Sequence, residues 1–556
     1  MKQYTSILLM KLPYCTHPDA KQDNDYRTKA PFRPLPSLAL ASLYSFFEKY
    51  RTCEYKLQAV DLNIEAYSAS SIPINIAQYQ NSLAKYIRES IYDVLALSVT
   101  FIFNARWVQE AVELSRKFHP QAKIIVGGGY PTLLPERVLQ KHDVDDVVVG
   151  EGEATFLHII NKYNNYTDKS LEEHFPFGGY AIRDSSGHIQ MFPQRNYFLD
   201  MRDLPPPRWD CLNVEKYFAN SGDMTLPIEA SRGCPYNCSF CSTFISWGRK
   251  IRYKPVDNFV QEVYDVKQKY PNVNLSVVDD NMTFSKEWIT QCLTQIISRN
   301  LTHTLTPGGF SVKHLDEEVI DLWIKAGCER FHIAVETGSP EMQKHIRKNI
   351  DLEKVRQLVS IFRKKNVSFN ILWMVGFPGE TLKQIQETFA LVRELRAFLN
   401  QFSIVLPYPQ TELFNQAKEQ DLLAFDEENL ENYDRRKADC VKSNEWDHKQ
   451  LLEMIYDINI ETNFLNNPFL ETAEKMDYFL AYLENLLIKL PDHVIAHIVV
   501  GYIQKKKNNN DKRNFHYNRG LSLLRDDTLS CTFKKYLKWD HEIIKDFNSF
   551  HQSNES

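Results

Sequence analysis

The segment Ser231-Arg232-Gly233-Cys234-Pro235-Tyr236-Asn237-Cys238-Ser239-Phe240-Cys241-Ser242 places three cysteines within eight residues. Their spacing is C-x3-C-x2-C, and Gly233 and Pro235 flank the first of them. The apolar stretch that precedes the segment, at 227–230, is typical of a buried strand. We therefore expect the cysteines to lie on a loop between a strand and a helix.

Three thiolates on one short loop suit a [4Fe–4S] cluster, because each binds one iron and the fourth iron stays open to another ligand. A structural zinc site is the first alternative. Zinc takes four closed ligands, however, and the nearest histidines in the sequence are His188 and His303. Three incidental buried cysteines are the second alternative, which the tight spacing disfavours. We predict that Cys234, Cys238 and Cys241 bind an iron–sulfur cluster.

Strand and helix patterns alternate through residues 221–420, on both sides of the cysteines. Strands are expected at 227–230, 274–279, 304–310, 330–336, 368–375 and 402–406. The segment 256–270 is an example of the helices between them, with apolar residues at helical spacing. Six strand–helix units predict a partial (β/α)6 barrel, whose active site lies at the carboxyl ends of its strands.

The rest of the chain divides into three parts. Residues 1–165 repeat a strand–helix–strand pattern, with strands expected at 6–10, 55–60, 93–99, 122–126 and 144–149. They predict a Rossmann-like, doubly wound parallel sheet. We expect 166–220 to be a linker with a hairpin at 180–192, because Pro205-Pro206-Pro207 continues neither a helix nor a central strand. Residues 421–556 are expected to be helical, with an exposed loop at 505–513.

The composition is that of a globular protein, with 43% hydrophobic and 25% charged residues. A formal net charge of -5 gives no support to a nucleic-acid partner. The longest apolar run near the C-terminus, 494–503, is about half of the roughly 20 residues that cross a membrane. No secretory signal is visible. We expect a cytoplasmic protein without a transmembrane segment.

With Phe240 before its last cysteine, the triad resembles the cluster loop of the radical S-adenosylmethionine (SAM) superfamily. In that family SAM chelates the open iron and is cleaved to methionine and a 5′-deoxyadenosyl radical. Three later segments share the resemblance: Val278-Asp279-Asp280-Asn281, Ala334-Val335-Glu336-Thr337-Gly338 and Val375-Gly376-Phe377-Pro378-Gly379-Glu380-Thr381. A fourth, Pro407-Tyr408-Pro409-Gln410-Thr411, resembles the family's P-x-P-G-T element with Gln410 in place of glycine.

The resemblance implies that Phe240, Asp280, Glu336 and Gly376 bind SAM. It places Asp280 near the amino end of SAM, Glu336 at the ribose hydroxyls and Gly376 near the adenine. Each of these three has a structural alternative: a helix N-cap for Asp280, a plain strand end for Glu336, and a Pro-Gly turn for Gly376.

The first domain resembles the cobalamin-binding domain that precedes many radical SAM barrels. The matching segments are Ser98-Val99-Thr100, Gly127 to Thr132 and Gly150 to Phe156. The resemblance implies that cobalamin contacts Ser98, Thr100, Gly128, Gly129, Gly150 and Glu151. The sequence has no D-x-H-x-x-G motif, whose histidine binds cobalt in other cobalamin enzymes. A domain that kept the fold and lost the cofactor is the alternative.

Together these resemblances imply a cobalamin-dependent radical SAM enzyme of the C-methyltransferase type, with a [4Fe–4S] cluster, SAM and cobalamin as cofactors. A reducing partner such as flavodoxin or ferredoxin is expected. Three alternatives stay open: a cyclase or rearrangement enzyme with the same cofactors, a non-catalytic corrinoid or cluster carrier, and a zinc-stabilised structural protein. The expected substrate is a small molecule or a peptide.

Overall fold

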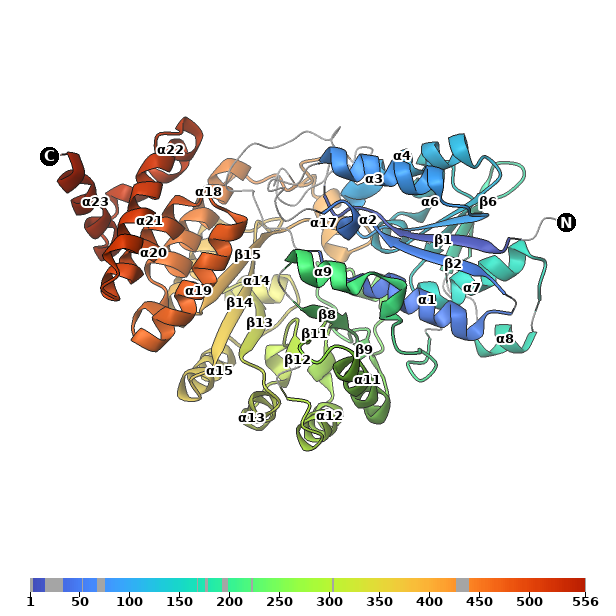
Figure 1. Cartoon of the computed structure of the whole chain (residues 1–556), viewed down its shortest axis with the longest axis horizontal. Helices are drawn as coiled ribbons and strands as arrows, with labels where there is room; N and C mark the ends of the chain where they lie inside the picture. The colour runs from blue at the N-terminus through green and yellow to red at the C-terminus, as the bar shows by residue number, and fades with distance from the viewer. Residues whose placement is uncertain are drawn as a thin grey trace.

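The computed structural model describes residues 4–15, 34–52, 54–67, 76–167, 169–175, 179–192, 199–221, 224–302, 305–426 and 440–555. Figure 1 shows three parts in a row: an N-terminal α/β part, a central set of strands and helices, and a C-terminal group of helices. The central part lies between the other two.

A seven-stranded sheet forms the core of the N-terminal part, in the order β2-β1-β3-β4-β5-β6-β7. Its first five strands are parallel, as predicted: β1 (Ser6–Lys11), β2 (Lys56–Asp61), β3 (Val94–Ser98), β4 (Lys123–Gly127) and β5 (Asp146–Val149). Helices cover both of its faces, which explains why β3 is buried at every position. The Rossmann-like arrangement predicted for this region is confirmed.

Two pairs of helices enclose this sheet. On one face α1 (Leu38–Tyr50) packs against α7 (Gly152–Tyr163), through Phe46, Phe47 and Phe156. On the other face α3 (Ile76–Glu89) packs against α4 (Ala105–Phe118), around the fully buried Trp107. The shorter helices here are α2 (Leu62–Glu65), α5 (Gly129–Leu133) and α6 (Pro135–Lys141).

The segment 166–220 is not the linker that the sequence predicted. It contains α8 (Lys169–His174), β6 (Gly179–Arg183), β7 (Ile189–Phe192) and α9 (Val214–Ser221). The expected hairpin is present, and β6 pairs antiparallel with β5, so the N-terminal sheet continues into this segment. The strands are short and partly exposed because they form the edge of the sheet, and this weakens their apolar pattern.

The central part has six parallel barrel strands in sequential order, which confirms the predicted partial barrel. They are β8 (Thr225–Ile228), β11 (Asn274–Val277), β12 (Leu305–Pro307), β13 (Arg330–Glu336), β14 (Ser368–Val375) and β15 (Leu399–Ile404). A bridge between Phe310 and Ile333 joins the first three strands to the last three. The predicted bounds of β13 and β14 match the structure, whereas β15 begins three residues earlier than expected.

Helices follow the barrel strands, and several of them lie on the outside of the barrel in Figure 1. They are α11 (Val256–Lys269), α12 (Lys286–Ser298), α13 (Glu317–Lys325), α14 (Pro340–His345), α15 (Leu352–Lys364), α16 (Leu382–Leu395) and α17 (Glu412–Glu419). A short antiparallel pair, β9 (Ser231–Arg232) with β10 (Arg252–Tyr253), and α10 (Thr243–Trp247) surround the cysteine segment. The carboxyl ends of β8 and β11 thus lie beside this segment.

The C-terminal helices form a core of their own. They are α18 (His448–Asn459), α19 (Ala473–Lys489), α20 (Val494–Lys506), α21 (Asn510–Leu523), α22 (Asp527–Phe533) and α23 (Glu542–Glu555). The apolar run at 494–503 is the buried centre of α20. In the described part of the chain, no helix is both long and apolar enough to cross a membrane.

The loop predicted at 505–513 is much shorter in the structure, because α20 ends at Lys506 and α21 begins at Asn510. Asn508 takes a left-handed backbone conformation with φ +58°. The side chain of Asn509 then caps α21 by accepting a hydrogen bond from the Lys512 amide. Two adjacent asparagines therefore form a tight turn here, where the polar composition had indicated a longer loop.

Side-chain amides cover the exposed edge of strand β15. Asn463 lies in a π-helical turn (Ile460–Leu465), accepts a hydrogen bond from the Asn400 amide at 2.7 Å and donates one to the Asn400 carbonyl at 2.8 Å. Asn467 donates to the Phe398 carbonyl at 2.9 Å. The C-terminal helices thus bond to the backbone of the last barrel strand. Their asparagine side chains make the hydrogen bonds that the backbone of a neighbouring strand would otherwise make.

Candidate functional site

The cysteine loop runs from β9 to α10, at the carboxyl end of the first barrel strand, as the sequence predicted. Gly233 enters it with φ +90°, and a Cβ atom there would lie 2.5 Å from the Lys250 carbonyl oxygen. Only glycine fits this conformation and this close approach. The backbone of the loop therefore requires glycine before the first cysteine, whether or not a ligand is bound.

Two other barrel segments hold the middle of the loop. The Ser239 amide donates to the Ile346 carbonyl at 3.0 Å, after α14, and the Ser239 carbonyl accepts from the Leu413 amide at 2.9 Å. Phe240 packs against Phe377, with their ring centroids 6.1 Å apart. The side chain of Phe240 thus fixes the loop to the segment that follows β14.

The three thiols are half-buried and interact electrostatically with one another. Burial raises the pKa of the Cys234 and Cys238 thiols above the ordinary value. Within the described ranges, no group of three or more histidine, cysteine, aspartate or glutamate side chains is placed to hold one metal ion.

Polar groups at the carboxyl end of β11 lie on one side of the triad. The Asn281 amide nitrogen is 3.9 Å from the Cys234 sulfur. Asp280 accepts a hydrogen bond from the Thr243 hydroxyl at 3.0 Å, and burial raises its pKa to about 6. Asp279 accepts from the Ala230 amide at 2.8 Å and has a structural role at β8. Asp280 does not cap a helix, so its N-cap alternative is not realised.

An ion pair lies near Cys238 and Cys241. Glu336 ends β13 with φ +71° beside an irregularity in the strand pairing, and its carboxylate is 2.9 Å from the Lys348 ammonium. Burial alone would lower the pKa of Lys348, but Glu336 and the thiols of Cys238 and Cys241 raise it above the ordinary value. Sequence analysis missed Lys348, because no local pattern links it to a strand end 12 residues earlier.

The loop after β14 folds around a buried carboxylate. Glu380 accepts hydrogen bonds from the Gly376 amide at 2.6 Å and the Phe377 amide at 3.1 Å, and burial raises its pKa to about 7. Gly376 has φ +83°, and a Cβ atom there would lie 2.8 Å from a methyl group of Leu451 in α18. The first of the C-terminal helices therefore packs directly on this loop.

Gln410, which replaces a glycine in the family resemblance, keeps a glycine-like backbone. Its φ is +68°, in the left-handed region. Its side-chain nitrogen donates to the Leu133 carbonyl at 2.5 Å, at the end of α5 in the N-terminal part. The substitution therefore preserves the local backbone shape and adds a contact between the two parts.

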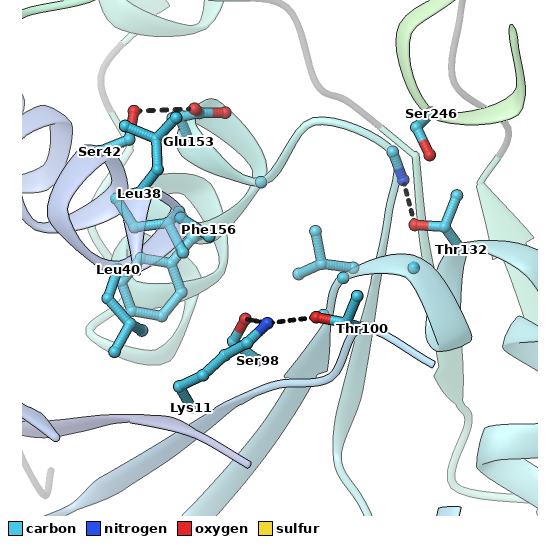
Figure 2. A pocket seen from close by; sticks show the side chains of 18 of the residues that line it. Lys11, Leu38, Leu40, Ser42, Ser98, Thr100, Thr132, Glu153, Phe156 and Ser246 are labelled. Carbon is cyan, nitrogen blue, oxygen red and sulfur yellow. Dashed lines mark hydrogen bonds between the residues drawn. The ribbon is translucent and has the colours of Figure 1, made fainter. Parts of the chain in front are cut away.

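A cavity of about 340 Å³ lies between the carboxyl ends of the N-terminal sheet and the barrel, within the size range of small-molecule sites. Its wall includes Ser98, Thr100, Gly128, Gly129 and Gly150, which are five of the six residues expected at a cobalamin site. From the barrel it receives Asp280, Ser246 and Trp247. Figure 2 shows Ser98 and Thr100 bonded to Lys11, and Ser246 near the opposite wall. Phe240, Glu336 and Gly376 do not line this cavity.

Two glycines keep the cavity open by close backbone packing. A Cβ atom on Gly128 would lie 2.4 Å from the Val99 carbonyl oxygen, and one on Gly129 would lie 2.4 Å from the Thr100 carbonyl oxygen. Gly128 also has φ +108°. Any side chain here would push the loop after β3 away, so the triple glycine shapes this wall.

Glu151, the sixth expected cobalamin residue, lies in an ion-pair network instead of the cavity wall. Its carboxylate is 2.7 Å from Arg252 and 3.5 Å from Arg232, and it accepts from the Leu199 amide at 2.7 Å. Arg232 also contacts Glu153 at 2.6 Å and Glu229 at 2.8 Å, with its own side chain only 3% exposed. We call these five residues the interdomain network, since two come from the N-terminal part and three from the barrel.

Family models match both parts of the chain that form this site. The model of the Radical SAM superfamily matches residues 228–392, and that of the B12 binding domain matches residues 53–160. The first match contains the cysteine triad, Asp280, Glu336 and Gly376. The second contains β3, β4 and β5, which end at the cavity, whereas β1 lies before it.

Curated relatives and solved structures resemble the chain over longer spans. Cytidylyl-2-hydroxyethylphosphonate methyltransferase of Streptomyces wedmorensis is 24% identical over 83% of this chain and 90% of the relative. The anaerobic magnesium-protoporphyrin IX monomethyl ester cyclase of Synechocystis sp. is 27% identical, over 46% of this chain and 50% of the relative.

Two solved structures show the same fold. OxsB, a cobalamin-dependent SAM radical enzyme with aqua-cobalamin and SAM bound, has a TM-score of 0.63 and 15% identity, over 98% of this chain and 84% of that chain. TsrM, a radical SAM methyltransferase from Kitasatospora setae with cobalamin and a [4Fe–4S] cluster bound, has a TM-score of 0.59 and 17% identity, over 75% and 78% of the two chains. The likeness to OxsB extends over the C-terminal helices as well.

Proposed function

The chain belongs to the radical SAM superfamily and carries a B12-binding domain before its barrel, and from this we propose a specific activity. It is a cobalamin-dependent enzyme that cleaves SAM reductively at a [4Fe–4S] cluster and methylates an unactivated carbon of its substrate. One observation carries the proposal. Asp280, which interacts electrostatically with Cys234, also lines the cavity between the two domains, so the cluster loop adjoins that cavity.

The residues fit a four-iron cluster and SAM. Cys234, Cys238 and Cys241 would hold three irons and leave the fourth for SAM. Asp280, near Cys234, and Glu336, near Cys238, would bind the amino end and the ribose hydroxyls, while Gly376 and Phe240 would border the adenine. When bound, the cluster and SAM supply one-electron cleavage, and the protein positions them and excludes water.

The cavity fits part of a cobalamin. Ser98 and Thr100 present hydroxyls to it, and Gly128, Gly129 and Gly150 let backbone approach a ligand closely. Cobalamin supplies methyl transfer when it is bound. Because the cavity wall also contains Trp247 from α10, a ligand bound there would touch the helix that follows the cysteines.

The test uses protein purified and reconstituted without oxygen, with a chemical reductant and SAM carrying a trideuterated methyl group. We expect absorbance of both cofactors, formation of 5′-deoxyadenosine and S-adenosylhomocysteine, and a labelled methyl group in a small molecule from the host extract. Protein that binds both cofactors but forms no 5′-deoxyadenosine would be a carrier, and the proposed activity would be wrong.

Cyclisation or rearrangement is the second candidate function. It is favoured by the 27% identity to a cyclase, a value above that of the phosphonate methyltransferase but over a shorter span. The same experiment separates the two candidates. A cyclase would form 5′-deoxyadenosine and a changed product without the labelled methyl group.

The proposal includes four points outside the site. A flavodoxin or ferredoxin would deliver the electron, and the protein would work in the cytoplasm. We place the functional domains at 1–165 and 221–420, with β6 and β7 extending the first sheet. The helices of 421–556 would support the barrel and, through Leu451, the loop that borders the adenine.

Lys348→Met tests the proposed role of Glu336 in SAM binding. The Lys348 ammonium holds the Glu336 carboxylate, so its loss should weaken SAM binding about 10- to 100-fold, the range of a charged hydrogen bond of roughly 1.5–3 kcal/mol. Anaerobic equilibrium dialysis measures the affinity, and iron analysis should show an unchanged cluster. Lys364→Met, on the exposed face of α15, is the control. Equal SAM affinity in both variants would contradict the assignment.

A further inference from the structure

A buried lysine forms part of the cavity floor. Lys11 is the last residue of β1, and its side chain is 4% exposed. Its ammonium donates hydrogen bonds to the Ser98 hydroxyl at 3.2 Å and to the Thr100 hydroxyl, as Figure 2 shows. Sequence analysis passed over it because the strand SILLMK otherwise reads as an ordinary apolar strand. A lysine at the end of such a strand is nevertheless unusual in a protein interior.

No carboxylate in the described part of the chain lies within ion-pair distance of this ammonium. The nearest acidic partner in the sheet is Asp61, which stands opposite Lys11 in the register of β2. One oxygen of its carboxylate, Oδ1, accepts hydrogen bonds from the amide and the side-chain nitrogen of Asn63, at 2.9 and 2.8 Å. Burial lowers the pKa of Lys11 to about 8, and the charge of Asp61 partly opposes this, so the amine stays mostly protonated at neutral pH.

The other charges on the cavity wall are accounted for. Arg232 is paired with carboxylates of the interdomain network, while Asp279 and Asp280 accept hydrogen bonds from neighbouring groups. Lys11 is thus the cation on the described wall that contacts two hydroxyl groups and the ring of Tyr14, whose centroid lies 5.1 Å from the ammonium, but has no carboxylate within ion-pair distance. Since a buried charge is costly unless it is paired, an anionic group of the ligand would stabilise it.

Cobalamin has one such group, the phosphodiester of its nucleotide loop. A lysine ammonium has three N–H donors, two of which Ser98 and Thr100 occupy, and lysine is a common partner of phosphate. We propose that Lys11 binds the phosphodiester of the cobalamin nucleotide loop through its third N–H. This inference rests on the proposed function and adds a determinant that selects cobalamin over corrinoids without the phosphate. The acidic groups at the barrel end of the cavity disfavour a phosphate there.

Three corrinoids test the inference by binding alone: aquocobalamin, cobinamide phosphate, which keeps the phosphate without the base, and cobinamide, which lacks both. Their affinities are measured by absorbance titration on the full-length protein. We expect the wild type to bind the first two at least 10-fold more tightly than cobinamide. Lys11→Met should lose about 10- to 100-fold in affinity for those two and leave cobinamide binding unchanged, as expected for one charged hydrogen bond.

Lys123→Met is the matched control, because Lys123 lies on β4 outside the cavity and pairs with Asp145 at 2.6 Å. Lys11→Gln keeps a donor without the charge and serves if the methionine variant does not fold. Equal weakening of all three corrinoids would overturn the inference and show that Lys11 only supports Ser98 and Thr100. Wild-type protein that binds both cobinamides equally would also overturn it. Wild-type protein that binds none of the three would refute the cobalamin site itself.

Discussion

Cys234→Ala is expected to lose the cluster and all detectable SAM cleavage while it keeps cobalamin binding. The cluster depends on three thiolates, and a site reduced to two does not hold four irons stably. Iron should fall from about four atoms per chain to below one. The cavity is lined by other residues, so the affinity for aquocobalamin should match that of the wild type. Iron analysis, 5′-deoxyadenosine measured by chromatography and a cobalamin titration check the three parts of this result.

Cys531→Ala is the control for this experiment. It makes the same chemical change at an exposed cysteine of α22. It should keep full iron content and wild-type SAM cleavage. If Cys234→Ala cleaves SAM at the wild-type rate, the assignment of the triad is wrong. If it also loses cobalamin, the cluster loop supports the cavity more than its lining residues indicate.

Arg232→Met is expected to cause the largest loss of stability. Its guanidinium contacts three carboxylates in the buried interdomain network, so the variant removes a charged partner from each of them. Breaking a buried ion pair by removing one side costs about 3–5 kcal/mol, and Trp247 would lose a cation–π contact at 4.7 Å as well. The free energy of unfolding, from urea denaturation followed by tryptophan fluorescence and by circular dichroism, measures the effect.

Arg356→Met is the control that shows how much of the loss of stability depends on the burial of the ion pair. Arg356 binds both oxygens of Glu394, at 2.5 and 2.9 Å, but its side chain is 40% exposed. Surface pairs contribute about 0–1 kcal/mol, so this variant should stay close to the wild type. Similar losses in the two variants would mean that the interdomain network adds no more than a surface ion pair.

The strand patterns predicted the fold well where both faces of a strand are buried. The bounds of β13 and β14 follow from segments rich in apolar residues that end before glycine, and the five parallel N-terminal strands follow from similar apolar segments. The hairpin β6–β7 was found, but its place in the first sheet was not. Its pairing with β5 joins Asp146 to Ile182, and no local pattern contains such a distant partner.

For the candidate site, too, residues in local sequence motifs were predicted, and residues that depend on distant partners were not. Motifs with fixed spacing identified the cysteines, and the family segments identified residues at four strand ends. Charge pairs across domains had no such signal: Glu153 meets Arg232 at a separation of 79 residues. Glu151 was therefore assigned to cobalamin from its motif, whereas its carboxylate joins the two domains. Lys11 and Lys348 were not predicted as site residues, because the groups that each of them contacts are distant in the sequence and come close only in the folded chain.

The asparagine amides along β15 have a consequence for the chain as a whole. A barrel of six strands does not close, and an unpaired strand edge is a template on which another protein molecule can add a strand. Asn463 and Asn467 occupy the backbone groups of Asn400 and Phe398 from within the same molecule. The terminal helices thus occupy backbone groups that a strand of another molecule would need for pairing at this edge of the barrel.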